Sequence, residues 1–395
     1  MKLAFVISEY NPFHCGHEYM IQKLREELGD VIVVAIMSTS FVQRGEPALF
    51  PYEVRARTAV ECGADLVISL PVPYSMAGGS FFARAGVRIA STFLCDEKYL
   101  VFGSESGKID SLSEMAFNMS RPEYIAALSD RSMDEPYAEA VVRIYRELYG
   151  KSLEDRLSQP NNILAIEYIR SISEEGSDLR PFTVKRVGSG YNDDSSCGDF
   201  LSATALRRLF YEGREDLFCS KVPRVAADIY REAIENGNYS LGWEGLSDGV
   251  ITFLRLSRDG AFSHCAEMSG GLDRRLVTAA HTVGTIEELF RCVSTKRFTN
   301  ARIRRAILSA LLSVTEADIS AAPEYTMVLA ANKKGTSALR VVDDNRINVV
   351  TKPSLVNTDS PSGVILSASE ALYAMSLKNK RSTNDFMKIT PYIKR

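Results

Sequence analysis

The stretch that decides the fold stands at the start of the chain, 3-LAFVISEYNPFHCGHEYMI-21. It opens with five apolar residues, 3–7, which have the length and character of a strand buried on both faces of a parallel sheet. A turn around Pro12 follows, and helix-compatible sequence begins near His14. At such a strand–turn–helix junction, free backbone N–H groups and the helix dipole favour an anion. The stretch therefore predicts a phosphate site.

Two histidines of this stretch, His14 and His17, stand three residues apart. At a helix start both can face one side and donate hydrogen bonds to phosphate oxygens. Gly16 lets the backbone come close to a ligand, because it has no Cβ. Structural histidines, or half of a metal site, are the alternatives for an isolated HxGH pattern. Cys15 directly follows His14, so along a helix its side chain points away from the histidine side. No other Cys and no further His stands nearby at the spacing of metal ligands. We therefore predict a nucleoside triphosphate site and no metal site.

Composition places the chain among ordinary globular proteins. Its 395 residues suggest two or three domains, and 45% hydrophobic and 25% charged residues can build a full core. The net charge of −3 means that any nucleic-acid site must be a local patch. Seven scattered cysteines without a CxxC motif indicate reduced thiols. No apolar run reaches the roughly 18 residues of a membrane span, and the first run is too short for a signal peptide. We expect a cytoplasmic protein.

Strands and helices alternate over the first hundred residues. Continuous apolar strands separated by helices are typical of an α/β fold with a doubly wound parallel sheet. Ligands bind such sheets at the carboxyl ends of the strands. The strands are expected at 3–7, 31–37, 65–70 and 98–102, and the helices between them at 51–62 and 81–93. The polar segments 8–17, 38–46, 71–80 and 103–107 should therefore meet around one pocket.

The remaining pattern predicts two domains. Residues 1–215 form the nucleotide-binding domain, with a helical excursion at about 111–173 that breaks at 159–162. A strand at 181–187 and a polar loop at 188–199 complete it. Residues 216–395 form a mainly helical C-terminal domain that ends in a small α+β region. Short strands are expected there at 326–331, 339–342 and 346–350.

A second phosphate element is predicted at 200-FLSATALR-207. Ser202 is a good N-cap residue, and the N–H groups that follow it face outward at a helix start. Thr204 adds a hydroxyl, and Arg207 stands one turn further on the same side. Hydroxyls, N–H groups and a guanidinium together make an anion clamp. The alternative is a plain N-cap followed by a surface arginine.

One long stretch of the chain, 289–315, carries cations and no acidic residue. Its basic residues are Arg291, Lys296, Arg297, Arg302, Arg304 and Arg305. A basic helix can neutralise several phosphates, and Phe298 would offer a stacking surface for a base. The alternative is a solvated face paired with Glu287 and Glu288. We predict contact with RNA.

The two phosphate elements, together with EYNPFH (9–14) and FVQRGEPA (41–48), resemble the HIGH-type nucleotidyltransferase superfamily. More narrowly, the chain resembles the bacterial tRNA(Met) cytidine acetate ligase family. Stretches that match the family are dense in the first half of the chain. They are sparse in the second half, where the matching stretches are 296–308 and 367–375. One departure is Cys15, where members commonly carry Asn; this leaves the predicted phosphate contacts in place.

The resemblance implies that the N-terminal sheet is a nucleotidyltransferase-like Rossmann fold. It also implies an ATP-dependent ligase that activates acetate as acetyl-adenylate, releases pyrophosphate and acetylates the wobble cytidine of elongator tRNA(Met) to N4-acetylcytidine. It implies catalytic roles for His14, His17 and Arg207. The implied ATP site consists of Ile7, Ser8, Glu9, Tyr10, Asn11, Pro12, Phe13, His14, Cys15, Gly16, His17, Glu18, Tyr19, Met20, Gly103, Asn161 or Asn162, Arg186, Ser202 and Thr204. Asn161 and Asn162 have the alternative of capping the next helix, and Gly103 that of a simple turn.

The expected partners are ATP, with Mg²⁺ from charge alone, acetate and tRNA(Met), with no membrane and no protein partner. Gln43 and Arg44, at the end of the second strand, could hold acetate, tRNA or phosphate. Two other functions fit parts of the pattern. One is a small-molecule adenylyltransferase that acts on a phosphorylated substrate. The other is an RNA-binding protein with a vestigial nucleotide pocket, against which the intact His14, His17 and Arg207 count.

Overall fold

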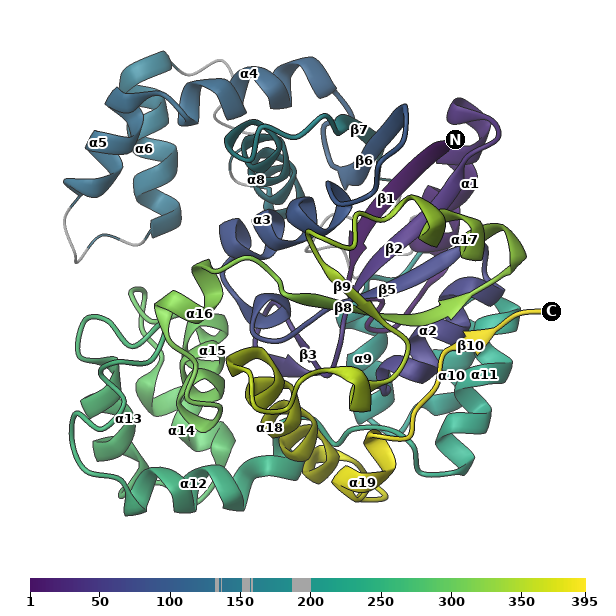
Figure 1. Ribbon diagram of the computed structural model, residues 1–395. Coiled ribbons are helices and arrows are strands. Elements are labelled where there is room, and N and C mark those ends of the chain that lie inside the picture. Colours follow the sequence, from purple (N-terminus) through teal and green to yellow (C-terminus); the bar gives the residue numbers. More distant parts are fainter. Residues whose placement is uncertain (132–134, 136, 151–156, 158, 187–199) are drawn as a thin grey trace.

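A computed structural model describes residues 1–131, 135, 137–150, 157, 159–186 and 200–395 of the chain (Figure 1). Within these residues, eight strands form one central sheet, in the order β10-β8-β5-β2-β1-β6-β7 with β9 beside β8. The predicted loop at 188–199 lies outside the described residues. The expected strand before it ends at Lys185.

The parallel part of the sheet is the one that the apolar runs predicted. It consists of β1 (Lys2–Ser8), β2 (Ile32–Ser38), β5 (Leu66–Leu70), β6 (Glu97–Ser104) and β7 (Arg180–Lys185). β2 is buried along its whole length because helices cover both faces. From β1 the sheet grows through β2 to β5, and it then resumes on the other side of β1 with β6. This reversal puts the switch point between β1 and β6, where doubly wound sheets bind ligands.

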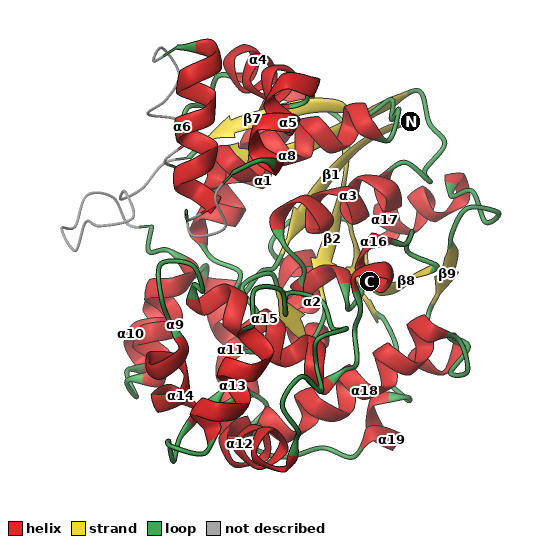
Figure 2. Ribbon diagram, turned by 90° about the vertical axis from the view of Figure 1, so that its left-hand side faces the viewer, coloured by secondary structure: helices red, strands yellow, loops and turns green. Residues whose placement is uncertain are grey.

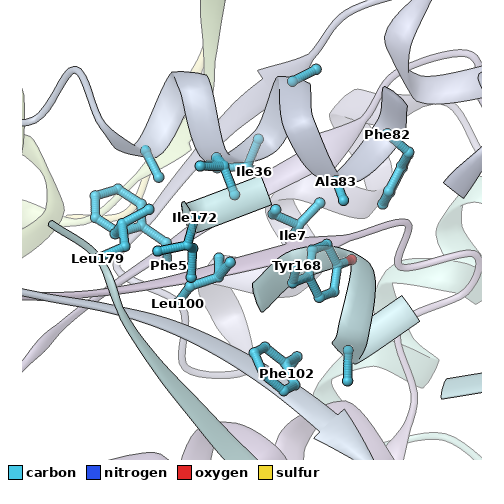
Figure 3. Packing of buried hydrophobic residues seen from close by; sticks show 14 of the residues in the cluster. Phe5, Ile7, Ile36, Phe82, Ala83, Leu100, Phe102, Tyr168, Ile172 and Leu179 are labelled. Carbon is cyan, nitrogen blue, oxygen red and sulfur yellow. The ribbon is translucent and has the colours of Figure 1, made fainter. Parts of the chain in front are cut away.

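Side chains of β1 alternate between two cores, as the two-residue period of a strand requires. Leu3, Phe5 and Ile7 belong to one core, and Ala4 and Val6 to the other. Figure 3 shows the first core, in which Phe5 and Ile7 meet side chains of α3 (Gly79–Ala90) and α8 (Pro160–Glu174). The second core packs under α1 (Cys15–Leu28) and α2 (Tyr52–Glu61).

The other helices form the excursion, which lies at the top of the molecule (Figure 1, Figure 2), and a second group below it that is divided between two separate cores. The excursion comprises α4 (Ile109–Met119), α5 (Pro122–Ser129) and α6 (Tyr137–Tyr149). The second group comprises α9 (Ala203–Tyr211), α10 (Glu215–Ser220), α11 (Arg224–Glu235), α12 (Ser247–Leu256), α13 (Leu272–Ala280), α14 (Ile286–Val293), α15 (Asn300–Leu311) and α16 (Glu316–Ser320). Short 3₁₀ turns lie at Tyr74–Met76, Glu244–Leu246 and Pro353–Leu355.

The end of the chain returns to the sheet. β8 (Tyr325–Ala331) runs antiparallel to β5, and β9 (Asn348–Val350) and β10 (Tyr392–Ile393) lie parallel to β8. α17 (Lys333–Ala338), α18 (Pro361–Ser376) and α19 (Thr383–Phe386) complete this region. The sheet thus takes strands from both sides of the proposed domain boundary at residue 215, which stays a prediction.

One predicted strand, 339–342, is wrong. The segment Leu339–Val341 is a 3₁₀ turn that directly continues α17. The side chain of Asn332 caps α17 by accepting from the Gly335 N–H at 2.8 Å. A helix started there runs straight into these β-branched and apolar residues, so the local capping signal outweighs their strand propensity.

A buried arginine on α2 fixes the loops that follow β1 and β2. Arg55 is completely buried and donates only to backbone carbonyls among its described partners. It reaches Glu9 O at 2.6 Å, Phe50 O at 2.8 Å, Ser38 O at 2.9 Å and also Thr39 O. Three of these carbonyls lie at the carboxyl edge of the sheet, so Arg55 holds the two loops together there.

Replacing this arginine should destabilise the fold strongly. Arg55→Met leaves buried carbonyls without donors, and we expect the free energy of unfolding in urea to fall by about 3 kcal/mol or more. Arg57→Met is the matched control on the same helix, because Arg57 is partly exposed and pairs with Glu232 at 2.9 Å. It should cost about 1 kcal/mol or less. Equal losses in the two variants would contradict this role of Arg55.

Candidate nucleotide site

The two histidines form the start of α1. His14 is the N-cap, and its Nδ1 accepts from the Gly16 N–H at 3.0 Å. The Nδ1 of His17 accepts from the His14 N–H at 3.2 Å. The rings stack with centroids 3.8 Å apart and planes at 24°, so they lie on one side of the helix start, as their spacing predicts. Because each Nδ1 accepts, the neutral rings carry their proton on Nε2, which leaves that N–H as the donor for a ligand.

Burial keeps both imidazoles uncharged. It lowers the pKa of His14 to about 3, with a further contribution from the positive charge of Arg186. The pKa of His17 lies well below its usual value, first through burial and then through His14 and Arg186. The rings of Tyr10 and Phe13 cover His17 at centroid distances of 4.9 and 5.4 Å. The pair therefore offers hydrogen bonds to an anion without adding charge.

Two more of the expected residues lie beside the histidines at the switch point. Gly103 is near the end of β6, and Arg186 directly follows β7. A Cβ at Gly103 would lie 3.3 Å from Cγ of Arg186, so the absent side chain leaves room for that arginine. Arg186 is also near enough to both imidazoles to lower their pKa. The structure thus gathers His14, His17, Gly103 and Arg186 in one place.

Asn161 and Asn162 hold the start of α8. The carboxylate of Glu105 accepts from the N–H groups of both residues, at 3.3 and 2.8 Å. The Asn161 amide also donates to Glu105 at 2.6 Å. Asn162 is fully buried; its Oδ1 accepts from Ser106 N–H at 3.2 Å and its Nδ2 donates to Gln159 at 2.8 Å. The capping alternative is therefore wrong, because α8 begins at Pro160, both residues lie inside its first turn, and Glu105 rather than an Asn side chain accepts from their N–H groups. A nucleotide contact of either amide stays a prediction.

The second phosphate element touches the first. Ser202 caps α9 by accepting from the Ala205 N–H at 3.2 Å, which confirms the predicted N-cap, and Thr204 is exposed beside it. Arg207 donates to the backbone carbonyl of Asn11 at 2.9 Å, across 196 residues of sequence. The rings of Tyr19 and Phe200 also approach to 6.0 Å. The two loops therefore converge at one edge of the sheet.

A short hairpin, β3 (Phe41–Val42) and β4 (Glu46–Pro47), lies over this edge. The Gln43 N–H donates to the Glu9 carboxylate at 3.0 Å. Burial raises the pKa of Glu9, while Arg207, the Gln43 hydrogen bond and Arg44 oppose that rise. The hairpin thus faces the first loop, as expected for Gln43 and Arg44, and a ligand for either residue stays a prediction.

The basic stretch is partly neutralised within the fold. Arg304 pairs with Glu46, and Arg305 with Glu267 at 2.6 Å. Arg302 lies 3.6 Å from Glu267 and donates to Ser269. These partners differ from Glu287 and Glu288, the expected ones. Arg291 and Lys296 are exposed, so an RNA contact would depend most on them and on the half-exposed Arg297.

Phe298 was expected to offer a stacking surface for a base, and this expectation is wrong. Its ring is only 6% exposed. The guanidinium groups of Arg297 and Arg302 lie over it at 5.3 and 5.1 Å. An aromatic residue followed by an amphipathic helix is as typical of a core anchor as of a stacking platform, and here the core position prevails.

Three contributors to the site were not identified from the sequence, although one of them, Glu46, lies within the motif FVQRGEPA (41–48). Arg55, Glu46 and Glu105 find their partners across loops or between separate elements. Cys15 turns from the histidines toward the helical part of the chain, where its thiol donates to Lys221 O at 3.7 Å. Among the described residues, no three His, Cys, Asp or Glu side chains gather as a metal site would require. Nor does that part of the chain contain a helix long and apolar enough to cross a membrane.

Two neutral imidazoles lie at the first helix start of a doubly wound sheet, and an arginine from a second helix start contacts the same loop. These features define a HIGH-type nucleotidyl transferase. The family model described as HIGH Nucleotidyl Transferase matches residues 1–387.

Two curated relatives share the name tRNA(Met) cytidine acetate ligase. The protein of Halothermothrix orenii is 34% identical over 91% of this chain and 90% of its own length. That of Acetivibrio thermocellus is 32% identical over 86% and 85%. The crystal structure of Thermotoga maritima TmcAL bound with alpha-thio ATP superposes with a TM-score of 0.86 at 30% identity, covering 100% of this chain and 99% of that one. The chain therefore belongs to the tRNA(Met) cytidine acetate ligase family of HIGH nucleotidyl transferases.

The low pKa of His14 makes the stability of the fold depend on pH. Between the ordinary histidine pKa of about 6.5 and its folded value of about 3, the unfolded chain binds a proton that the folded chain does not. Stability is therefore present above the unfolded pKa and falls as the pH drops. We expect the free energy of unfolding of His14→Asn, which keeps an N-cap, to fall less between pH 7 and pH 5, by up to about 1.4 kcal/mol per pH unit.

His281→Asn is the control for this measurement, because His281 is an exposed residue at the end of α13. It should leave the slope of the free energy of unfolding against pH as it is in the unmodified protein. A wild-type slope in His14→Asn would show that His14 is not buried as a neutral ring.

Proposed function

We propose that this chain is an ATP-dependent ligase that activates acetate as acetyl-adenylate and acetylates the wobble cytidine of elongator tRNA(Met). One observation carries the nucleotide part of the proposal. Arg207 of the second phosphate element donates to Asn11 in the first, beside the switch point of the sheet. The fold that relatives named tRNA(Met) cytidine acetate ligase share, and the alpha-thio ATP bound by the Thermotoga maritima protein, support it.

In the first step, a carboxylate oxygen of acetate attacks the α-phosphorus of ATP. The bond from that phosphorus to the bridging oxygen breaks, and pyrophosphate leaves with the electron pair. Charge grows on the leaving group, so donors aimed at it accelerate the step. We assign this role to the Nε2–H groups of His14 and His17 and to the guanidinium of Arg207. Arg186 supplies a second positive charge near the imidazoles.

In the second step, the exocyclic amine of cytidine attacks the carbonyl carbon of acetyl-adenylate. AMP leaves with the electron pair, and the amine loses one proton. Neither step needs a nucleophile from the protein, which agrees with a Cys15 thiol directed at Lys221 O. Mg²⁺ would accompany ATP and neutralise phosphate charge. The glycine and polar residues assigned to the ATP site in the sequence, including Ser202 and Thr204, are proposed to line the same nucleotide.

The helical part of the chain after residue 215 is proposed to hold the tRNA. Its exposed cations Arg291 and Lys296, with Arg297, would contact phosphates most directly. Arg302, Arg304 and Arg305 would first have to share or give up Glu267 and Glu46. Their contribution to affinity should therefore be smaller than their number suggests.

Purified protein given ATP, acetate and tRNA(Met) should form AMP, pyrophosphate and acetylated cytidine, measured by chromatography of the nucleotides and of the digested tRNA. His17→Ala should reduce ATP turnover by about 100-fold or more, because it removes a donor to the leaving group. Its affinity for tRNA should remain close to that of the unmodified protein.

Omitting tRNA and offering phosphorylated small molecules separates this activity from a small-molecule adenylyltransferase. Adenylylation of such an acceptor, with no acetate-dependent AMP, would overturn the ligase assignment. A joint loss of turnover and tRNA affinity in His17→Ala would indicate misfolding rather than a catalytic defect, and the thermal unfolding midpoint distinguishes the two.

Replacing a cation that contacts an RNA phosphate should make the affinity for tRNA depend less on the salt concentration. Lys296→Gln should weaken tRNA binding and lower the slope of log affinity against log salt by about 1. Arg305→Gln should lower it less, because Arg305 already pairs with Glu267 at 2.6 Å. Lys380→Gln, at an exposed position after α18, is the control and should leave the slope unchanged. Equal slopes in all three variants would place the RNA elsewhere.

A further inference from the structure

One carboxylate, that of Glu46, is shared between the two halves of the chain. Its Oε2 accepts from Nη2 of Arg207 at 3.0 Å, and its Oε1 accepts from Nη1 of Arg304. Arg207 belongs to α9 in the nucleotide site, and Arg304 belongs to α15 in the basic stretch. The carboxylate is only 21% exposed and the Arg207 side chain 12%, so solvent screens their pairing less than it would at the surface.

Glu46 cannot easily turn away, because its hairpin is held by backbone contacts on two sides. The backbone of α15 lies directly on Gly45, where a Cβ would come within 2.6 Å of the Arg305 nitrogen. The positive φ of 70° at Gly45 also suits glycine. The indole N–H of Trp243 donates to Gly45 O at 2.9 Å. On the other side, the Gln43 N–H is bound by Glu9.

The Arg207 guanidinium has two described anchors, Asn11 O and Glu46. A carbonyl alone lets a guanidinium pivot, whereas a carbonyl and a carboxylate on two different nitrogens fix its plane. A guanidinium fixed in advance loses less entropy when a phosphate binds, so Glu46 matters for the affinity of the site although it carries the same charge as the ligand.

We propose that Glu46 is a positioning residue that holds Arg207 ready for the phosphate tail of the nucleotide and ties this arginine to α15 through Arg304. The inference rests on the proposed nucleotide site, but it is independent of acetate and of the transfer to tRNA. Since Arg304 holds the other oxygen of the same carboxylate, an event on α15 that moves Arg304 changes how firmly Glu46, and with it Arg207, is held.

The test compares the affinity for a non-hydrolysable ATP analogue with the affinity for AMP, by calorimetry on the full chain. Glu46→Gln should raise the Kd for the ATP analogue about tenfold and leave the Kd for AMP unchanged, because only the longer phosphate tail needs Arg207. Arg304→Gln should raise the Kd for the ATP analogue about threefold, and should add nothing in the Glu46→Gln background.

Glu267→Gln is the matched control, since it removes the carboxylate that pairs with Arg302 and Arg305 on the same helix. It should leave both affinities unchanged. Equal weakening of the ATP analogue and AMP in Glu46→Gln, an effect of the same size in Glu267→Gln, or additive effects of Glu46→Gln and Arg304→Gln would each overturn the proposal. A protein that binds the analogue as expected but forms no acetate-dependent AMP would refute the proposed function alone.

Discussion

The candidate nucleotide site depends on a fully buried guanidinium, that of Arg55. The guanidinium of Arg55 donates hydrogen bonds to the backbone carbonyls of Glu9, Ser38, Thr39 and Phe50. A buried charge is tolerated only when its hydrogen bonds are satisfied, so the loops after β1 and β2 are drawn to positions that satisfy it. The first of these loops continues into the histidine pair, and the second into the hairpin that carries Glu46. One arginine therefore fixes the histidine pair and the hairpin of Glu46 relative to each other.

Neutral and charged donors come from different parts of the candidate site. The buried imidazoles of His14 and His17 are uncharged, which is why they can stack at 3.8 Å without repulsion. The positive charge comes instead from Arg186, which directly follows β7, and from Arg207 in α9. Under the proposed function, the imidazoles would contribute directed hydrogen bonds and the guanidiniums charge, a division suited to a leaving group whose charge grows during the reaction.

Local signals in the sequence predicted the elements that local interactions stabilise. The apolar run of β1, the helix start at His14 and the N-cap at Ser202 each arise from a few neighbouring residues. The sequence could not show β8 entering the sheet beside β5, because that pairing joins residues more than 250 positions apart. The partners of Arg55 and Glu46 were hidden for the same reason. The burial of the Phe298 ring could not be predicted either, because it depends on which distant parts of the chain pack against that ring.

The contacts between the nucleotide-binding part and the helical part of the chain hold the two parts in a fixed arrangement. Residues 40–48 meet the later chain through several different side chains. Ser40 donates to the buried carboxyl of Glu370, whose pKa burial raises to about 8, so the group is largely protonated at neutral pH. Tyr373 donates to Ala48 O at 2.9 Å, and Trp243 to Gly45 O. Because β8 also runs through the sheet, the helices and the candidate nucleotide site keep a set relative geometry. Under the proposed function, this geometry would favour transfer to a tRNA bound by the helices over hydrolysis of the activated acetate.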